Sequence, residues 1–101
     1  MVIEYIRYKV AVDQCAAFQR AYANAADILH RSDHCISYEL SQCTEDKEFF
    51  TVRIEWDSVE GHLNGFRKST EFAQFFELVK PFFQQIQEMR HYEIVDARPA
   101  R

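Results

Sequence analysis

The fold is decided by residues 35–56, which read CISYELSQCTEDKEFFTVRIEW. Both ends of this stretch alternate between apolar and polar side chains, as half-buried strands do. In 48–56 one face carries Phe50, Val52, Ile54 and Trp56, and in 35–43 one face carries Ile36, Tyr38 and Leu40. Residues 44–47 form a polar turn that is too short for anything but a hairpin. The stretch therefore predicts two antiparallel strands with one apolar side.

Upstream of this hairpin, the sequence predicts a strand and a helix. Residues 2–10 are rich in β-branched and aromatic side chains, which favours a strand. Asp13 offers a side chain that could cap the helix after it. The apolar face of that helix has the spacing i, i+4, i+7, i+11 and consists of Phe18, Tyr22, Ala25 and Leu29. The helix is expected to end near residues 30–32.

Downstream of the hairpin, two helical segments and a last strand are predicted. Asp57 or Ser58 caps a helix over 59–66, and Ser69 or Thr70 caps another over 71–79. Pro81 either ends that second helix or lies in the first turn of the next short one. Residues 88–95 return to alternation, which predicts a fourth strand.

The predicted order is β-α-β-β-α-β, which is the ferredoxin-like arrangement of the α+β class. Its four-stranded antiparallel sheet carries both helices on one face. A single domain is expected over residues 1–96, followed by a polar tail over 97–101. The other sheet face still carries Tyr5, Tyr92 and Ile94. Because an uncovered face with aromatic residues favours burial against a second copy, we expect a homodimer through the sheet face.

Length and composition narrow the possible functions. The chain has 101 residues, with 12 Lys and Arg against 16 Asp and Glu, for a formal net charge of -4. This acidic balance argues against nucleic acid as a partner, since phosphate binding needs a clustered basic face. No apolar run approaches the roughly 18–20 residues of a membrane span. No signal peptide is visible either, so a cytoplasmic protein without membrane contact is expected.

Cysteines, histidines and glycines offer no recognisable cofactor or metal motif. The odd number of cysteines, Cys15, Cys35 and Cys43, favours reduced and mostly buried thiols. His30 and His34 have a spacing of i, i+4, but the helix is expected to end before His34 and no distant ligand completes a set. Gly61 and Gly65 cannot form a glycine-rich phosphate loop. We therefore expect no metal and no bound cofactor.

Residues 53–60, Arg-Ile-Glu-Trp-Asp-Ser-Val-Glu, are followed by Ser69-x-x-Phe72-x-x-Phe75-Phe76. Together with residues 35–40, Cys-Ile-Ser-Tyr-Glu-Leu, they resemble the antibiotic biosynthesis monooxygenase family. The resemblance covers nearly the whole chain and implies a dimeric α+β barrel. Members of that family include cofactor-independent oxygenases of polycyclic aromatics, quinol oxygenases, haem-degrading enzymes and proteins of no known activity. The asparagine, tryptophan and histidine positions of the haem-degrading branch are not matched here.

Aromatic residues are concentrated in the second half of the chain. Eight of the nine phenylalanines lie between Phe49 and Phe83. If a cavity exists between sheet and helices, these rings and Trp56 line it and suit a planar aromatic ligand; the alternative is a well-packed core. The candidate substrate-binding residues are Tyr38, Phe66, Phe72 and Phe76.

Oxygenation without a cofactor needs a dry pocket, a base for the substrate's proton and a donor that holds the oxyanion. His62 is the candidate base, because its ordinary pKa of ~6.5 suits proton transfer near neutrality; the alternative is a solvated histidine. Trp56 is the second candidate catalytic residue, and a purely structural ring is its alternative. Tyr38, Arg53 and Arg7 are candidate donors, although alternation places both arginines on the polar sheet face, where ion pairs with Glu39 or Glu55 are expected instead.

Fold and resemblance together predict a small cofactor-independent monooxygenase that oxidises an aromatic or quinol substrate with dioxygen. A non-catalytic protein that binds a small ligand on the same dimeric scaffold is the main alternative, because fold does not fix activity. An isomerase on a related barrel is a further alternative, which needs a base but no oxygen.

Overall fold

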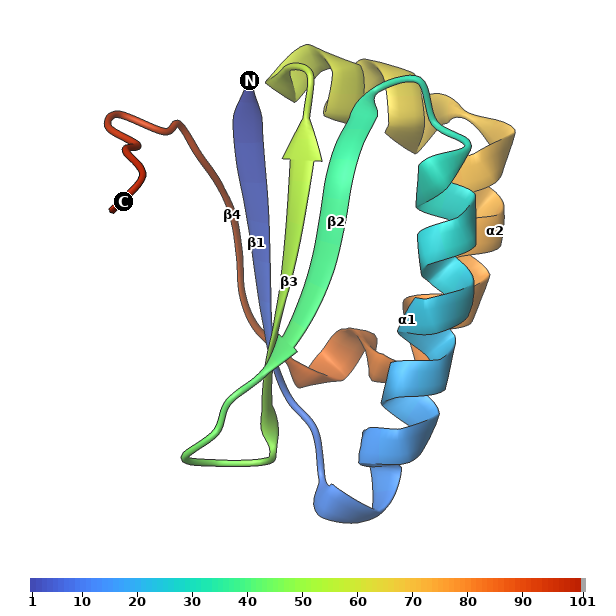
Figure 1. Cartoon of the computed structure of the whole chain (residues 1–101). Helices are drawn as coiled ribbons and strands as arrows, with labels where there is room; N and C mark the ends of the chain where they lie inside the picture. The colour runs from blue at the N-terminus through green and yellow to red at the C-terminus, as the bar shows by residue number, and fades with distance from the viewer. Residues whose placement is uncertain (101) are drawn as a thin grey trace.

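The computed structural model describes residues 1–100 and contains a four-stranded antiparallel sheet. Its strands are β1 (Val2–Lys9), β2 (Cys35–Gln42), β3 (Phe49–Trp56) and β4 (Ile86–Tyr92), in the spatial order β2-β3-β1-β4. The two main helices, α1 (Cys15–His30) and α2 (Thr70–Val79), pack against each other and cover one face of the sheet (Figure 1). The predicted ferredoxin-like α+β fold is confirmed.

Strand β1 lies in the middle of the sheet, with β3 on one side and β4 on the other. Its even-numbered residues are all buried and share the face that the helices cover: Val2, Glu4, Ile6 and Tyr8. Glu4 lies opposite Ile54 in β3 and opposite His91 in β4. A carboxylate therefore occupies a position that alternation assigns to an apolar residue.

The predicted apolar face of α1 is confirmed, because all four of its residues are fully buried: Phe18, Tyr22, Ala25 and Leu29. The predicted cap is wrong. Asp13 lies in a short 3-10 turn, η1 (Val12–Gln14), and α1 begins after it without a side-chain cap. Asp13 is part of that 3-10 turn, and Gln14 occupies the N-cap position in its place.

Helix α2 begins and ends as its polar residues predict. Ser69 is its cap, since the Oγ of Ser69 accepts a hydrogen bond from the backbone N–H of Phe72 at 3.3 Å. Pro81 lies in the first turn of a following 3-10 helix, η4 (Lys80–Gln85). Proline suits that position because its missing N–H has no helical partner there.

Two strand predictions need correction. Ile36 does not share the apolar face of β2 with Tyr38 and Leu40, because the β2–β3 register shifts between Cys35 and Ser37. The extra residue of this β-bulge turns the side chain of Ile36 outward, where it is 51% exposed. The last strand covers 86–92 rather than 88–95, so it begins and ends earlier than predicted.

Residues 57–68 depart from the predicted simple helix over 59–66. They contain a turn of π-helix, η2 (Gly61–Gly65), and a 3-10 turn, η3 (Phe66–Lys68). Ser58 caps this segment, since its Oγ accepts a hydrogen bond from the Gly61 N–H at 2.8 Å. The ring of His34 lies against both glycines, and a Cβ atom on Gly65 would lie only 2.4 Å from His34 Nε2. Glycine at both positions therefore lets the β2 entry and the π turn pack closely.

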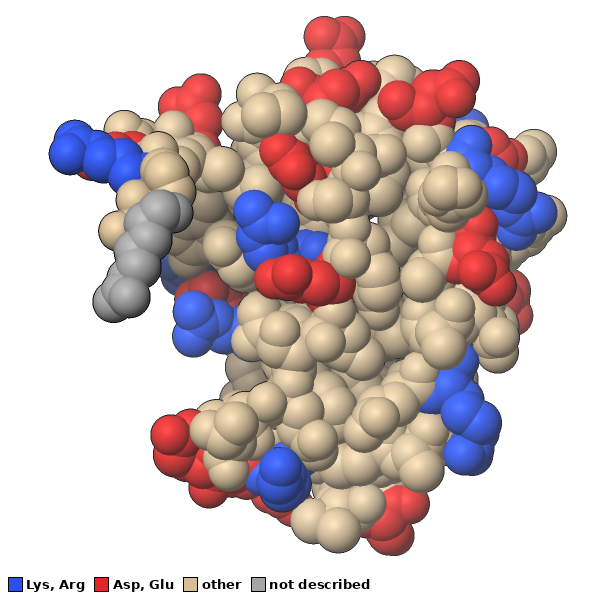
Figure 2. Space-filling model, viewed as in Figure 1, with Lys and Arg blue, Asp and Glu red and all other residues tan. Residues whose placement is uncertain are grey.

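The sheet face opposite the helices has no covering layer within residues 1–100 (Figure 1). Tyr5 and Tyr92 lie edge to face on it, with ring centroids 5.4 Å apart. Charged residues surround them, including the pair Arg7–Glu88 at 3.7 Å. Figure 2 shows acidic and basic side chains intermingled on the visible side of the molecule, with no broad field of one sign.

The cysteines Cys15, Cys35 and Cys43 are free, as expected, but each is partly rather than mostly buried. Among residues 1–100, no helix combines the length and apolarity that crossing a membrane requires. Residues 97–100 of the predicted tail have no helix or strand, and Arg101 lies outside the described residues.

Candidate functional site

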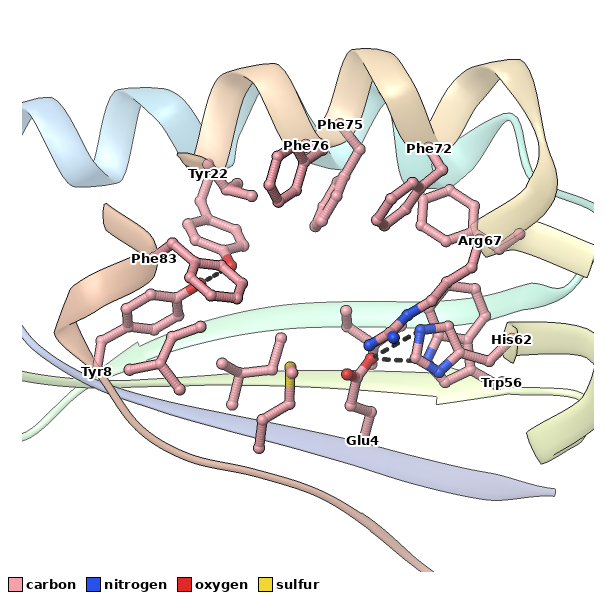
Figure 3. Close-up of a pocket in the computed structure, with 16 residues that line it drawn as sticks. Glu4, Tyr8, Tyr22, Trp56, His62, Arg67, Phe72, Phe75, Phe76 and Phe83 are labelled. Atoms are coloured by element: carbon pink, nitrogen blue, oxygen red, sulfur yellow. Dashed lines mark hydrogen bonds and ion pairs between the residues drawn. The ribbon is translucent and has the colours of Figure 1, made fainter. Parts of the chain in front are cut away.

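A cavity of about 240 Å³ lies between the inner sheet face and α2 (Figure 3). Most of its wall is aromatic: Trp56, Phe66, Phe72, Phe75, Phe76 and Phe83. Arg67, Phe83 and Met89 line it but are exposed, so the cavity opens to solvent beside them. A cavity is therefore present between sheet and helices, where the sequence left a well-packed core as the alternative, and charged side chains gather at one end of it.

The charged end of the cavity is built around Trp56. Its indole Nε1–H donates a hydrogen bond to Glu4 Oε1 at 3.0 Å, from one central strand to the next. The ring of His62 stacks on the indole, with centroids 4.3 Å apart and an interplanar angle of 9°. His62 Nε2 lies 3.6 Å from Glu4 Oε1, and His62 Nδ1 lies 2.7 Å from His91 Nε2. Strands β1, β3 and β4 and the π turn each contribute one member of this cluster.

Burial controls the charge states of Glu4 and His62, whose side chains are about 3–4% exposed. Burial raises the pKa of the Glu4 carboxyl, although the Trp56 hydrogen bond and the nearby Arg67 oppose that rise. The pKa of His62 falls to about 3, first because of burial and then because of the positive charge of Arg67. The same two causes lower the pKa of His91. Both imidazoles are therefore uncharged near neutral pH. The ordinary pKa of ~6.5 that favoured His62 as a base in the sequence does not apply in the folded chain, and the alternative of a solvated histidine is wrong because His62 is buried.

Arg67 supplies the positive charge of the site. It comes from η3, and in Figure 3 its guanidinium group points toward Glu4 and His62. The guanidinium group is a cation, and it lies at the mouth of a cavity whose wall is mostly aromatic. Such a cation can hold an oxyanion on a bound ligand.

The opposite end of the cavity carries two tyrosine hydroxyls (Figure 3). Tyr8 and Tyr22 are hydrogen-bonded through their hydroxyl oxygens, which lie 2.5 Å apart. Burial raises the pKa of Tyr8 to about 12 and raises that of Tyr22 as well. These hydroxyls consequently stay protonated and can only act as neutral hydrogen-bonding groups.

The structure gathers most, but not all, of the predicted site residues around this cavity. His62, Trp56, Phe66, Phe72 and Phe76 line it. Tyr38 does not, because it stacks on Tyr22 with an interplanar angle of 7° and lies outside the lining set.

Neither of the two candidate arginine donors reaches the cavity. Arg7 and Arg53 lie on the uncovered sheet face, as alternation predicted. Arg7 forms its ion pair with Glu88 of β4 rather than with a glutamate of β2 or β3. The cation of the site is Arg67 instead.

Glu4, Arg67 and His91 are members of the site that sequence reasoning missed. A signal existed for Glu4, because its position in β1 has the same parity as Val2, Ile6 and Tyr8, and a lone carboxylate in an apolar run is unusual. His91 shares parity with Met89 in β4. Nothing in the sequence marks Arg67, since its direction depends on the 3-10 turn that follows the π-helix.

Glu4, His62 and His91 also have the donor types of a metal site. One ligand atom from each lies within 4.8 Å of the others. Two histidines and a carboxylate can bind a divalent transition metal. Arg67 acts against this, because its positive charge already balances Glu4 and depresses the proton affinity of both imidazoles. The charge distribution suits an anion beside Arg67 better than a further cation.

Acid should destabilise the fold through His62. Because its pKa is about 3 in the folded chain and ~6.5 when unfolded, the folded state binds fewer protons between these values. We expect the free energy of unfolding to fall by up to about 1.4 kcal/mol for each pH unit below 6.5, down to about pH 3. Denaturant unfolding of the wild type at about pH 6.5 and about pH 4.5 should show this slope, and His62→Gln should reduce it.

The exposed His30 at the end of α1 provides the control for this prediction. His30→Gln should keep the wild-type slope. Glu4 also contributes to the pH dependence of the free energy of unfolding, with the opposite sign to His62. This contribution is present in the wild type and in both variants, so it cancels when their slopes are compared. Equal slopes in the wild type and His62→Gln would show that His62 does not lose its proton on folding.

Comparison with known proteins gives matches in sequence and in structure. The family model for antibiotic biosynthesis monooxygenases matches residues 1–78. The uncharacterized protein YczJ of Bacillus subtilis (strain 168) is 30% identical over 78 residues, which are 77% of this chain and 82% of YczJ.

Solved structures with the same fold have lower sequence identity. A variant of SnoaB, a cofactor-independent oxygenase from Streptomyces nogalater, is 13% identical with a TM-score of 0.81, over 97% of this chain and 96% of that one. A Bordetella bronchiseptica protein described with the same family name is 23% identical with a TM-score of 0.77, over 93% and 96% of the two chains. At these identities the likeness concerns the fold alone.

Proposed function

Because the chain belongs to the antibiotic biosynthesis monooxygenase family, we propose that it is a cofactor-independent monooxygenase that oxidises an aromatic or quinol substrate with dioxygen. The observation that carries this proposal is the cavity, which joins an aromatic wall to one end with a buried base and a cation. At about 240 Å³ it is smaller than the roughly 300–1,000 Å³ of sites for drug-sized ligands. A substrate of one or two rings fits this space.

Such a substrate can supply all the electrons of the reaction. Removal of the proton from a quinol O–H gives an anion that can pass an electron to dioxygen. Recombination of the two radicals forms a peroxide anion at a ring carbon. When its O–O bond breaks, that carbon loses its hydrogen as a proton and keeps one oxygen as a carbonyl. The other oxygen leaves as water, after it has taken up this proton and the one removed from the substrate O–H at the start. The ring ends as a hydroxyquinone, so that no external reductant is needed.

The residues of the cavity divide this chemistry among them. His62 accepts the substrate's proton at Nε2, the nitrogen that faces Glu4 rather than His91. Arg67 holds the oxyanion that results. The aromatic wall, with Trp56 and Phe72 among its members, keeps water from the anion and stacks on the substrate ring.

Removal of the cation should slow the reaction strongly. We expect Arg67→Gln to lower kcat/KM for oxygen consumption by roughly 10²–10³-fold, the usual loss for one oxyanion donor. Lys68→Gln is the matched control, because Lys68 is the next residue, is also exposed and does not line the cavity. If both variants lose the same fraction of kcat/KM, Arg67 contributes only to the net charge of the surface and does not hold the oxyanion.

The uncovered sheet face supports a homodimer, in which two such faces pack together. We expect equilibrium sedimentation to give twice the 12.0 kDa mass of one chain. Tyr5→Lys should reduce the mass to that of one chain, because Tyr5 lies opposite Arg53 and Arg90 and the new ammonium adds to their charge. Val12→Lys, at an exposed position of η1, should remain dimeric. A wild-type mass of one chain at all concentrations would contradict the dimer.

Oxygen consumption by the purified protein tests the proposed function directly. The substrates are a panel of quinols and phenols with one or two rings, with a chelator present throughout. Uptake that requires the protein and persists with the chelator supports a cofactor-independent oxygenase. Tight binding of one aromatic compound without oxygen uptake by any of the panel would favour the ligand-binding alternative instead.

A further inference from the structure

The two imidazoles of the site form a chain, and within residues 1–100 the outer nitrogen at each end has no hydrogen-bond partner. His62 Nδ1 lies 2.7 Å from His91 Nε2, so one proton lies between them in a hydrogen bond. His62 Nε2 is on the other side of its ring, and its 3.6 Å separation from Glu4 Oε1 is too long for a hydrogen bond. His91 Nδ1 is the remaining nitrogen. The pair could therefore accept a proton at one end while it releases another at the far end.

This chain of nitrogens leads from the cavity to the surface. His62 is 3% exposed and lines the cavity. His91 does not line the cavity but lines an open hollow on the surface, together with Val59, Tyr92 and Glu93. The hydrogen bond between the imidazoles consequently joins a buried space to one that water reaches.

We propose that His62 and His91 form a proton relay, which carries the proton of a bound phenol or quinol to the surface and later returns one to the leaving oxygen. The inference rests on the proposed function and adds His91 to it. His91 touches neither the substrate nor the reacting atoms, so that it is a positioning residue that acts through His62.

Each step of the relay moves one proton along the chain. The substrate's O–H bond breaks as a new N–H bond forms at His62 Nε2, while the His62 Nδ1–H proton passes to His91 Nε2. His91 then releases its Nδ1 proton to water. When the peroxide O–O bond breaks, His62 Nε2–H protonates the leaving oxygen, His91 Nε2 returns its proton to His62 Nδ1, and His91 Nδ1 regains a proton from solvent. The starting tautomers are restored without rotation of either ring.

The surroundings of His62 favour a relay over simple proton storage. A positive charge on His62 would be buried beside the positive charge of Arg67. Glu4 does little to balance it, because Arg67 and the Trp56 N–H already stabilise the Glu4 carboxylate. In the relay, His62 gives up a proton as it gains one and stays neutral. The charge forms on His91 instead, which is only partly buried and borders the surface hollow.

Rescue by a small buffer tests the relay. In dilute, non-imidazole buffer, His91→Gln should lower kcat by roughly 10²-fold, near the lower end of the range for positioned proton transfer, with KM unchanged. Added imidazole should restore kcat with saturation, because a free base in the surface hollow can take the place of the missing ring. His34→Gln is the matched control: its ring contacts Asp57 and the glycines rather than the cavity, so that its kcat should respond to imidazole as the wild type does. A His91→Gln enzyme with wild-type kcat, or with a low kcat that imidazole does not restore, would overturn the relay.

A second measurement is independent of turnover. In ¹⁵N spectra of the labelled wild type at neutral pH, the relay requires His62 to carry its proton on Nδ1 and to leave Nε2 free. Protonation of Nε2 in the resting protein would overturn the relay even if the oxygenase activity is present. If no substrate causes oxygen uptake, the proposed function fails, whereas the tautomer still decides whether the imidazole chain is arranged as a relay.

Discussion

His62→Gln is expected to lower kcat/KM for oxygen consumption by roughly 10²–10⁴-fold, the range for loss of a positioned general base. Glutamine keeps much of the size of the side chain, so that the cavity wall is largely preserved. It cannot accept the substrate's proton, and the link from the cavity to His91 is lost with it. Initial rates of oxygen uptake over a range of substrate concentrations measure the effect.

Structural controls separate a catalytic role of His62 from a packing role. The Trp56 indole stacks on the His62 ring, so the substitution could also lower activity by disturbing the fold. Near-ultraviolet circular dichroism and native mass should therefore match the wild type. His30→Gln should leave the rate unchanged, because His30 is exposed at the end of α1. If His62→Gln retains full turnover, another group removes the proton.

Trp56→Ala is expected to lower the free energy of unfolding by about 3–5 kcal/mol, the usual cost of deleting a buried tryptophan. Trp56 is fully buried, and its ring contacts both His62 and Phe66. Its N–H is also the direct hydrogen-bond donor to the buried carboxylate of Glu4, which the substitution leaves without that partner. Urea unfolding with a constant m-value measures the loss.

Trp56→Phe distinguishes the structural role from a catalytic one. Phenylalanine keeps an aromatic ring against His62 but removes the hydrogen bond to Glu4, which should cost about 1–3 kcal/mol. Leu63→Ala, at a half-exposed site of the π turn, should cost less than either change at Trp56. A folded Trp56→Phe protein that consumes oxygen normally supports a structural ring, whereas a stable but inactive one supports a direct part in the reaction.

Periodicity predicted the fold because each element has a clear amphipathic pattern. The faces of β3 and α1 follow from alternation and from helical spacing, and both are buried as expected. The pattern fails where backbone geometry adds or shifts a residue. Ile36 lies in a β-bulge, which reverses the direction that strict alternation assigns to its side chain. The π turn over 61–65 likewise has more residues per turn than an α-helix, so that the 3.6-residue period does not describe it.

The candidate site was partly predictable for a related reason. Parity shows which face a side chain occupies, and it correctly places Trp56 inside and Arg53 outside. Parity does not show how far apart two residues on the same face lie. Tyr38 is on the predicted face, but it stacks on Tyr22 and does not reach the cavity. Contacts across the sheet, such as that between Glu4 and His91, depend on a strand order that the sequence does not state.

If the cavity binds a substrate as proposed, the tyrosine pair at its far end has a consequence for selectivity. Two hydroxyl groups bring two protons, and the hydrogen bond between Tyr8 and Tyr22 uses only one of them. Within residues 1–100 the structure gives neither hydroxyl a second partner, so one donor remains available at a buried position. A compound with an acceptor oxygen far from its reacting end satisfies that donor. An otherwise identical compound without this oxygen leaves it unpaired, a penalty of about 1–3 kcal/mol that favours rings oxygenated at both ends.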